Sequence, residues 1–143
     1  MIVFDLPWPP STNNAYAVMR GRKIKTARAR QYAQRVANRV AADVDRWGVE
    51  PAALKGERLR VFIVAHPPDR RKRDIANLEK LVTDSVFTAL GLDDCQIDWL
   101  AIARAAVEPA GRLAYHVGVM ECVERASAPR NTVSADSRLA GGH

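Results

Sequence analysis

The sequence lacks several features that would define its class at once. No apolar run approaches the ~20 residues of a membrane-spanning helix, so we expect no membrane association. The only cysteines, Cys95 and Cys122, form no CxxC spacing, which indicates neither a zinc site nor a disulfide framework. We expect both to be small, partly buried apolar residues. The N-terminus has no basic region of the kind that opens a signal peptide, so we expect a cytoplasmic protein.

Acidic residues are absent between Leu6 and Ala42, a stretch that is rich in arginine and lysine. Its basic residues are Arg20, Arg22, Lys23, Lys25, Arg28, Arg30, Arg35 and Arg39. A second basic run follows at Arg70, Arg71, Lys72 and Arg73, and the formal net charge is +6. Scattered cations would indicate a solvated surface, whereas a one-sign block with a second run favours a surface that binds phosphates.

Length and composition indicate one soluble domain. The chain has 143 residues, 48% of them hydrophobic and 27% charged, which is enough to bury a core but too few for two domains. Residues 125–143 show no periodicity, so we expect a disordered tail after a domain that spans residues 1–124.

The first half of the chain predicts a strand, a hairpin and a helix. Ile2–Leu6 reads as a short strand that Pro7 ends, and residues 16–25 read as a β-hairpin with a basic tip. Thr26 is a good N-cap for a helix that runs to about Trp47, with Gly48 as its stop. The side chains expected to face the core from this helix are Ala33, Val36, Val40, Val44 and Trp47.

The second half predicts a strand, a helix and a second hairpin. Residues 58–66 alternate as a strand, with Leu59, Val61, Ile63 and Ala65 on one face. A helix is expected over residues 75–90, with its apolar face at Ile75, Leu78, Val82, Val86 and Ala89. Residues 98–107 and 112–120 are predicted to pair as a hairpin around residues 108–111. The order predicts a small single α/β (α+β) domain with a mixed sheet and two main helices.

Carboxylates stand at both ends of the second helix, next to the basic run. Asp74 follows Arg73 directly, and Asp93 and Asp94 come after the stop at Gly91. Cations attract a nucleic-acid backbone, whereas carboxylates repel it unless a divalent metal ion lies between them, so the combination points to a metal-dependent enzyme acting on nucleic acid. Alone, Asp74 would be read as an N-cap, and Asp93 and Asp94 as turn residues.

These residues together resemble the RusA family of Holliday junction resolvases. The matching positions are Leu6-Pro7-Trp8-Pro9-Pro10-Ser11, Asn13-Asn14, Pro68-Asp69-Arg70-Arg71-Lys72-Arg73-Asp74, Asn77-Leu78, Lys80, Asp84 and Leu92-Asp93-Asp94. The resemblance covers roughly residues 2–121, and the pieces are specific only in combination. It implies a RusA-like fold and a homodimer that binds branched DNA at four-way junctions and nicks two strands symmetrically with Mg²⁺, or Mn²⁺ as a substitute. A location at the nucleoid or in a phage-infected cell would fit.

The resemblance also assigns residues. It implies catalytic roles for Asp74, Lys80 and Asp94, with Asp74 and Asp94 as metal ligands and Asp93 as a further candidate. Asp84 is expected instead to be a structural acceptor or the partner of a nearby cation. The candidate DNA-binding residues are Arg70, Arg71, Lys72, Arg73, Asn77, Asn13, Asn14, Arg20, Arg22, Lys23 and Lys25.

Ala76 departs from the family pattern, because a third acidic residue is expected at this position. Alanine offers no oxygen, so we expect weaker metal binding by Asp74 and Asp94 alone. Either a divergent natural member or a deliberately inactivated variant would have this residue. Two other functions stay open: a non-catalytic protein that binds junctions or branched DNA, and a basic RNA-binding accessory protein.

Overall fold

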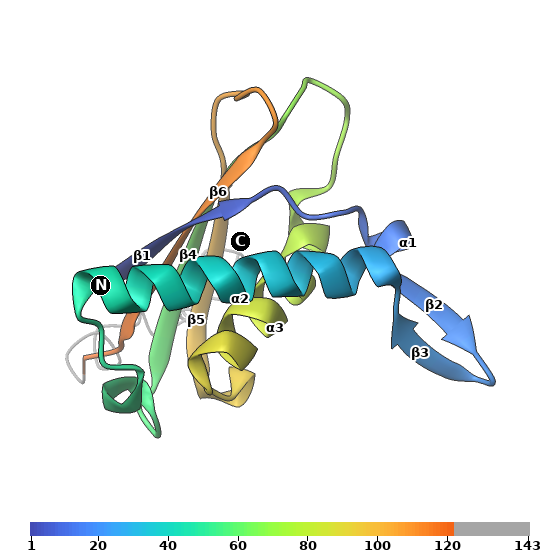
Figure 1. Cartoon of the computed structure of the whole chain (residues 1–143). Helices are drawn as coiled ribbons and strands as arrows, with labels where there is room; N and C mark the ends of the chain where they lie inside the picture. Colours follow the sequence, from blue (N-terminus) through green and yellow to red (C-terminus); the bar gives the residue numbers. More distant parts are fainter. Residues whose placement is uncertain (122–143) are drawn as a thin grey trace, which may run out of the picture.

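The computed structural model describes residues 1–121, apart from the side chains of Thr12 and Asn13. The main sheet has four strands, in the order β1 (Ile2–Pro7), β6 (Arg112–Val119), β4 (Leu59–His66) and β5 (Ile97–Arg104). Only the β4–β5 pair is parallel, so the sheet is mixed, as predicted. Two long helices, α2 (Ala27–Trp47) and α3 (Glu79–Leu90), lie across one face of it (Figure 1). The predicted class, a small α/β domain with two main helices, is confirmed.

Several short elements complete the described part of the chain. They are α1 (Thr12–Ala15), β2 (Tyr16–Met19), β3 (Arg22–Lys25) and the 3₁₀ turns η1 (Pro51–Leu54), η2 (Ile75–Leu78) and η3 (Asp94–Gln96). The predicted hairpin over residues 16–25 is confirmed: β2 pairs with β3 and projects away from the sheet (Figure 1). Arg20 and Gly21 form its tip with φ values of 52° and 74°, as a tight two-residue turn requires. No helix of the described residues is long and apolar enough to cross a membrane.

The core lies between the sheet and the helices. Leu59, Val61, Ile63 and Ala65 of β4 are fully buried on the face toward the helices, which confirms the predicted alternation. The side chain of Tyr115 from β6 is buried beside them, and its hydroxyl lies 3.1 Å from the hydroxyl of Thr83 on α3. The polar contact satisfies both buried groups and fixes α3 against the sheet.

The predicted hairpin of residues 98–107 and 112–120 is wrong, because β4 lies between β5 and β6. The turn at residues 108–111 reverses the chain, but the segment before it crosses the end of β4. There the Ala105 amide donates to the Ala65 carbonyl at 2.8 Å, and the Glu108 amide donates to the Pro67 carbonyl at 2.9 Å. Strand β4 thereby pairs on both edges, which satisfies the backbone groups of the most buried strand.

Helix α2 begins and ends as predicted. The Thr26 hydroxyl accepts from the Ala29 amide at 3.3 Å, and Gly48 ends the helix in the left-handed conformation. Trp47 is not a core residue: the buried stripe ends one turn earlier, at Asp43, and 66% of the Trp47 surface is exposed.

The helix predicted over residues 75–90 starts with the 3₁₀ turn η2, and the α-helical part begins at Glu79. From Leu78 onward the buried stripe advances by four residues, through Val82 and Val86 to Leu90. Ala89 lies outside this stripe and is exposed, contrary to prediction. Cys95 is also exposed, contrary to prediction, because η3 turns the neighbouring Gln96 inward to donate to the Leu54 and Glu57 carbonyls. Cys122 and residues 125–143 lie outside the described residues.

We predict that Gly111→Ala destabilises the fold more than a glycine substitution in open space. Gly111 has φ 73°, and a Cβ there would lie 2.8 Å from Cβ of Trp8. Gly56 has φ 74° with no atom within 4 Å of such a Cβ. Left-handed strain of about 1–2 kcal/mol applies to both variants, and overpacking of about 1–3 kcal/mol only to Gly111→Ala. Urea unfolding measures both, and equal losses of stability for the two variants would contradict the packing argument.

Candidate active site

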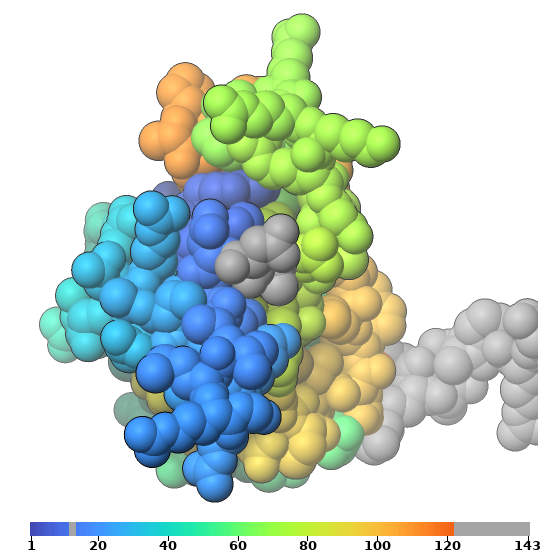
Figure 2. Space-filling model, turned by 90° about the vertical axis from the view of Figure 1, so that its right-hand side faces the viewer, coloured from blue at the N-terminus to red at the C-terminus, as the bar shows by residue number. Residues whose placement is uncertain are grey.

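Two loops leave the sheet at the same end and form the site. The last residue of β1, Pro7, and the last residue of β4, His66, both pair with Arg112 of β6. The segments that follow, residues 8–10 and 67–74, therefore start side by side. Figure 2 shows the loop of residues 67–74 and the β2–β3 hairpin on one face of the molecule, with the N-terminal segment between them.

Asp69 gives the basic loop its shape. Its carboxylate accepts from Nη1 of Arg73 at 2.6 Å and from the backbone amide of Arg71 at 2.9 Å. These hydrogen bonds lower the pKa of Asp69 to about 2, and the hydrogen bond from Arg73 has the largest effect. The guanidinium of Arg73 also lies 5.8 Å from the ring centroid of Trp8. Arg73, predicted to grip a phosphate, is thus already paired and partly enclosed.

The remaining cations of the loop face outward. Arg70 and Lys72 are exposed and make no hydrogen bond or ion pair to any residue the structure describes. The Arg71 side chain is 84% exposed and lies 3.8 Å from the Asp69 carboxylate. These three side chains are exposed to solvent, and their contacts with DNA phosphates stay a prediction.

Asp74 occupies the N-cap position before η2. Its Oδ1 accepts from the amide of Ala76 at 3.0 Å, which is the capping role that the residue type favours. Ala76 itself is exposed, so its methyl group contributes nothing to the core. A longer side chain at this position would extend toward solvent beside Asp74.

Lys80 joins two carboxylates at the start of α3. Its Nζ lies 3.1 Å from Oδ1 of Asp84 and 3.1 Å from Oδ2 of Asp94. These hydrogen bonds raise the pKa of the Lys80 ammonium, and the hydrogen bond to Asp84 has the largest effect. The expectation that Asp84 is the partner of a nearby cation is confirmed, and Lys80 and Asp94 of the predicted catalytic set are brought together.

Asp93 is used as a cap. Its Oδ1 accepts from the Cys95 amide at 2.9 Å, and the Asp93 amide donates to Oε1 of Gln96 at 3.1 Å. This capping box holds the pKa of Asp93 below its usual value, chiefly through the Cys95 amide. A cavity of about 320 Å³ nevertheless collects Asp93, Asp94 and Asp84 with Lys25 from the hairpin.

The carboxylates suit a hard cation by chemistry, although they do not form one compact cluster. Asp74 lines a different cavity from Asp94. Within residues 1–121, no group of three or more acidic, histidine or cysteine side chains is placed to hold a metal ion. Mg²⁺ takes oxygen ligands and is usually bound by one or two carboxylates, with water and phosphate oxygens completing its shell. The donor types of Asp74 and Asp94 therefore fit this ion.

The β2–β3 hairpin brings further cations to the same face of the molecule. It also carries Tyr16, a residue that the sequence analysis did not propose for the site. Arg20, Arg22 and Lys23 are exposed, and Nζ of Lys23 lies 4.5 Å from the ring centroid of Tyr16. The Tyr16 hydroxyl is buried without a hydrogen-bond partner among the described residues. Burial raises the pKa of the Tyr16 hydroxyl, and the negative charge of Asp84 raises it further. Tyr16 therefore lies near the ion pair of Lys80 and Asp84. No sequence signal marks Tyr16.

Of the two asparagines in the N-terminal segment, the structure describes the side chain of Asn14 but not that of Asn13. Asn14 is exposed and lines the same cavity as Asp74 and Asn77. The side chain of Asn13 lies outside the described part of the structure, so its contact with DNA stays a prediction.

A basic loop that leads into η2 and α3, and a lysine of α3 held between two carboxylates, define a nuclease-type site. Comparison with known proteins gives the family: residues 7–114 match the model described as "Endodeoxyribonuclease RusA", and the chain belongs to this family. It is 36% identical over 110 residues to the crossover junction endodeoxyribonuclease RusA of Escherichia coli (strain K12), covering 76% of this chain and 86% of that protein.

Two phage proteins are similar to a comparable degree. The crossover junction endodeoxyribonuclease of Enterobacteria phage 82 is 34% identical over 109 residues, covering 76% of this chain and 86% of that protein. That of Enterobacteria phage HK97 is 31% identical over 125 residues, covering 84% and 96%. The family expected from the sequence motifs is confirmed.

We predict that Asp69 titrates near pH 2 and that Arg73→Gln moves its pKa back toward 3.8. Because the folded pKa is depressed, the contribution of Asp69 to stability is present above its unfolded pKa of about 3.9. That contribution is lost as the pH falls through about 2. NMR of the Asp69 carboxyl carbon measures the titration. Arg70→Gln is the matched control, and an equal shift in both variants would contradict the pairing of Asp69 with Arg73.

Proposed function

We propose that this chain is a structure-specific endodeoxyribonuclease that binds four-way DNA junctions and resolves them by paired metal-dependent nicks. The observation that carries the proposal is the Asp84–Lys80–Asp94 arrangement beside a basic loop, in a member of the RusA family. The relatives named above are crossover junction endodeoxyribonucleases. Asp74, Lys80 and Asp94, to which the family resemblance gives catalytic roles, are present in this sequence.

Asp74 and Asp94 would hold Mg²⁺, with Mn²⁺ as a substitute. A bound metal ion would supply polarisation of the scissile phosphate and a lowered pKa for an attacking water. Lys80 contributes a fixed positive charge: two carboxylates raise its pKa, so it stays protonated at neutral pH and can stabilise negative charge on the phosphate or leaving oxygen. Asp93 is a further candidate ligand, which like Asp74 uses one oxygen as a cap.

Binding depends on the cations that face outward. Arg70, Arg71 and Lys72 on the loop and Arg20, Arg22 and Lys23 on the hairpin would contact phosphates, so affinity should fall steeply with salt and depend little on sequence. An enzyme of this kind acts on DNA in the cytoplasm, at the nucleoid or in a phage-infected cell.

Ala76 supports one alternative function. If two carboxylates do not bind the metal well enough, the chain is a junction- or branched-DNA-binding protein without nuclease activity. The loss of a carboxylate also removes repulsion of the phosphate backbone next to the basic loop, so binding would survive the loss of cleavage.

We predict that Ala76→Asp raises the rate of junction cleavage at least about tenfold, since a third carboxylate strengthens metal binding. The position is exposed, so the substitution leaves the core unchanged. A labelled synthetic four-way junction is incubated with each protein in Mg²⁺ and in Mn²⁺, and its affinity is measured in parallel without metal. Asp74→Asn in the Ala76→Asp background is the negative control.

Each outcome of the cleavage assay separates the functions. Cleavage by Ala76→Asp alone supports a resolvase that alanine at 76 disables, whereas cleavage by the unaltered chain means that Asp74 and Asp94 suffice. Tight binding without cleavage by either protein supports the binding function. Displacement of the junction by double-stranded RNA at equal concentration would support the RNA-binding function instead.

We also propose that the chain acts as a homodimer, because two matched nicks require two sites related by a twofold axis. The face of the sheet turned away from the helices supplies an apolar surface for the contact. Trp99 and Val3 are 47% and 48% exposed there, and the ring of Phe62 lies between those of Trp99 and His116, at 6.5 and 5.6 Å.

We predict that Trp99→Glu weakens self-association about tenfold or more, because a buried aromatic anchor would be replaced by a charge. Sedimentation equilibrium measures the effect. Trp47→Glu is the matched control, since Trp47 is 66% exposed on α2, away from the sheet face. A monomer in both variants and in the unaltered chain would contradict the dimer, and equal weakening by both variants would contradict this surface.

A further inference from the structure

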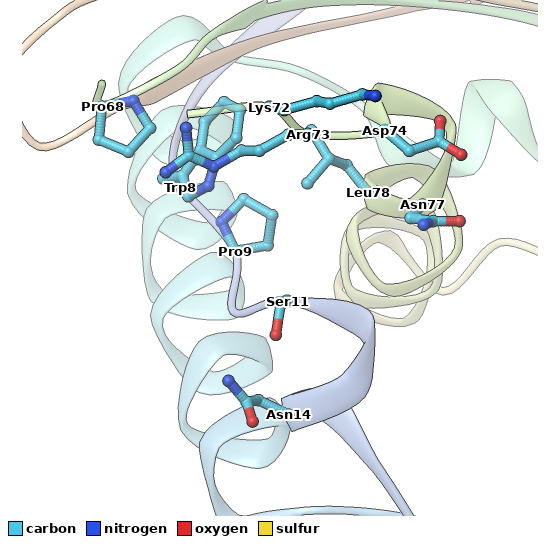
Figure 3. Close-up of a pocket in the computed structure, with 10 residues that line it drawn as sticks. All are labelled: Trp8, Pro9, Ser11, Asn14, Pro68, Lys72, Arg73, Asp74, Asn77 and Leu78. Atoms are coloured by element: carbon cyan, nitrogen blue, oxygen red, sulfur yellow. The ribbon is translucent and has the colours of Figure 1, made fainter. Parts of the chain in front are cut away.

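A cavity of about 470 Å³ lies between the N-terminal segment and the basic loop, directly beside Asp74 (Figure 3). Its size is in the range of small-ligand pockets, ~300–1,000 Å³. Trp8 and Arg73 form one side, while Ser11 and Asn14 lie at the opposite end (Figure 3). The phosphate contacts proposed above need exposed cations, and they do not explain a cavity with an aromatic wall.

The wall of the cavity is rigid. The guanidinium of Arg73 lies 5.8 Å from the ring centroid of Trp8, and Asp69 holds it at 2.6 Å. Trp8 is confined from behind: a Cβ on Gly111 would lie 2.8 Å from its Cβ and 3.0 Å from Pro68. An indole ring and a guanidinium plane are both surfaces on which a nucleobase stacks. Because the two side chains are already held in place, little ordering entropy is lost when a base binds.

Polar groups at the other end have no structural task that the described contacts reveal. Ser11 stands at the N-cap position of α1 but its hydroxyl makes no capping hydrogen bond. Asn14 is exposed, and its backbone is fixed by the Thr26 hydroxyl, which donates to the Asn14 carbonyl at 2.5 Å. The Ser11 hydroxyl and the Asn14 amide offer both donors and acceptors, which match the edge of a base.

We propose that this cavity receives one unstacked nucleobase of the DNA substrate, next to the phosphate that is cut. The base stacks on Trp8 and Arg73, its edge faces Ser11 and Asn14, and Lys72 at the border of the cavity contacts a neighbouring phosphate. The inference rests on the proposed junction-cleaving function and extends it from phosphate contacts to a base-binding pocket. Strands at a branch point are the place where a base is most easily unstacked, because stacking is already interrupted.

The test is an abasic scan of a synthetic four-way junction. A single abasic analogue replaces in turn each nucleotide that flanks the exchange point, and the dissociation constant is measured by fluorescence anisotropy without divalent metal ion. We expect one position at which loss of the base weakens binding about tenfold, the effect of one base–aromatic stack. Trp8→Ala and Ser11→Leu, which remove the wall and fill the cavity, should bind the intact and abasic junctions equally at that position.

Arg70→Ala is the matched control, because Arg70 is an exposed cation of the same loop outside the cavity. It should weaken binding of the intact and abasic junctions by the same factor. Ser11 is exposed, so Ser11→Leu tests the inference even if Trp8→Ala does not fold.

Tight binding with no sensitive abasic position would overturn the base-binding pocket and leave the proposed function standing. A sensitive position that both cavity variants retain would also overturn it. Failure of the unaltered chain to bind any junction would refute the proposed function, and this inference with it.

Discussion

Arg112 is the residue on which the functional end of the molecule depends. Its backbone is paired with Pro7 on one side and His66 on the other, so the loops after β1 and β4 leave the sheet together. Its guanidinium binds Glu108 through two hydrogen bonds, of 2.9 and 3.0 Å, and this ion pair holds the segment that crosses the end of β4. The same crossing places Gly111 behind Trp8. Sheet pairing and one bidentate ion pair thus determine where the basic loop and the N-terminal segment meet.

The charged residues of the site fall into two groups with different consequences. Arg73 and Lys80 are held by carboxylates, so their charges are locally compensated and their positions fixed. Arg70 and Lys72 face outward without such partners among the described residues. Fixed cations can stabilise charge at a defined atom, whereas exposed ones attract a polyanion over a distance and pay little desolvation cost. A site built from both kinds separates attraction of DNA from chemistry on one phosphate.

Features that depend on neighbouring residues were predicted well from the sequence. The pairing of strands that are distant in the sequence was predicted poorly. The alternation of β4 and the N-cap at Thr26 depend on neighbouring residues, and both were correct. The pairing of β5 with β6 was wrong because turn residues determine a chain reversal but not which strand lies between its arms. The predicted burial of Ala89 and Cys95 was wrong, because the buried stripe of α3 ends at Leu90 and η3 turns Gln96 inward instead of Cys95. In the site, the roles of Asp74, Lys80 and Asp94 come from the family resemblance and stay predictions, whereas the cavity beside Trp8 depends on contacts between distant segments that the sequence does not reveal.

We expect alanine at position 76 to affect DNA binding and metal-dependent cleavage in opposite directions. The Ala76 side chain is exposed, and its backbone amide donates to the capping carboxylate of Asp74, so neither the fold nor the loop conformation depends on a carboxylate side chain at position 76. A carboxylate at this point would add a negative charge beside Arg70 to Arg73, where a DNA backbone would approach, and would be favourable only with a cation between. Without it, the basic loop attracts DNA with less repulsion, while Asp74 lacks a neighbouring oxygen to share a metal ion. Under the proposed function, we therefore expect junction affinity to persist and metal-dependent cleavage to be weakened.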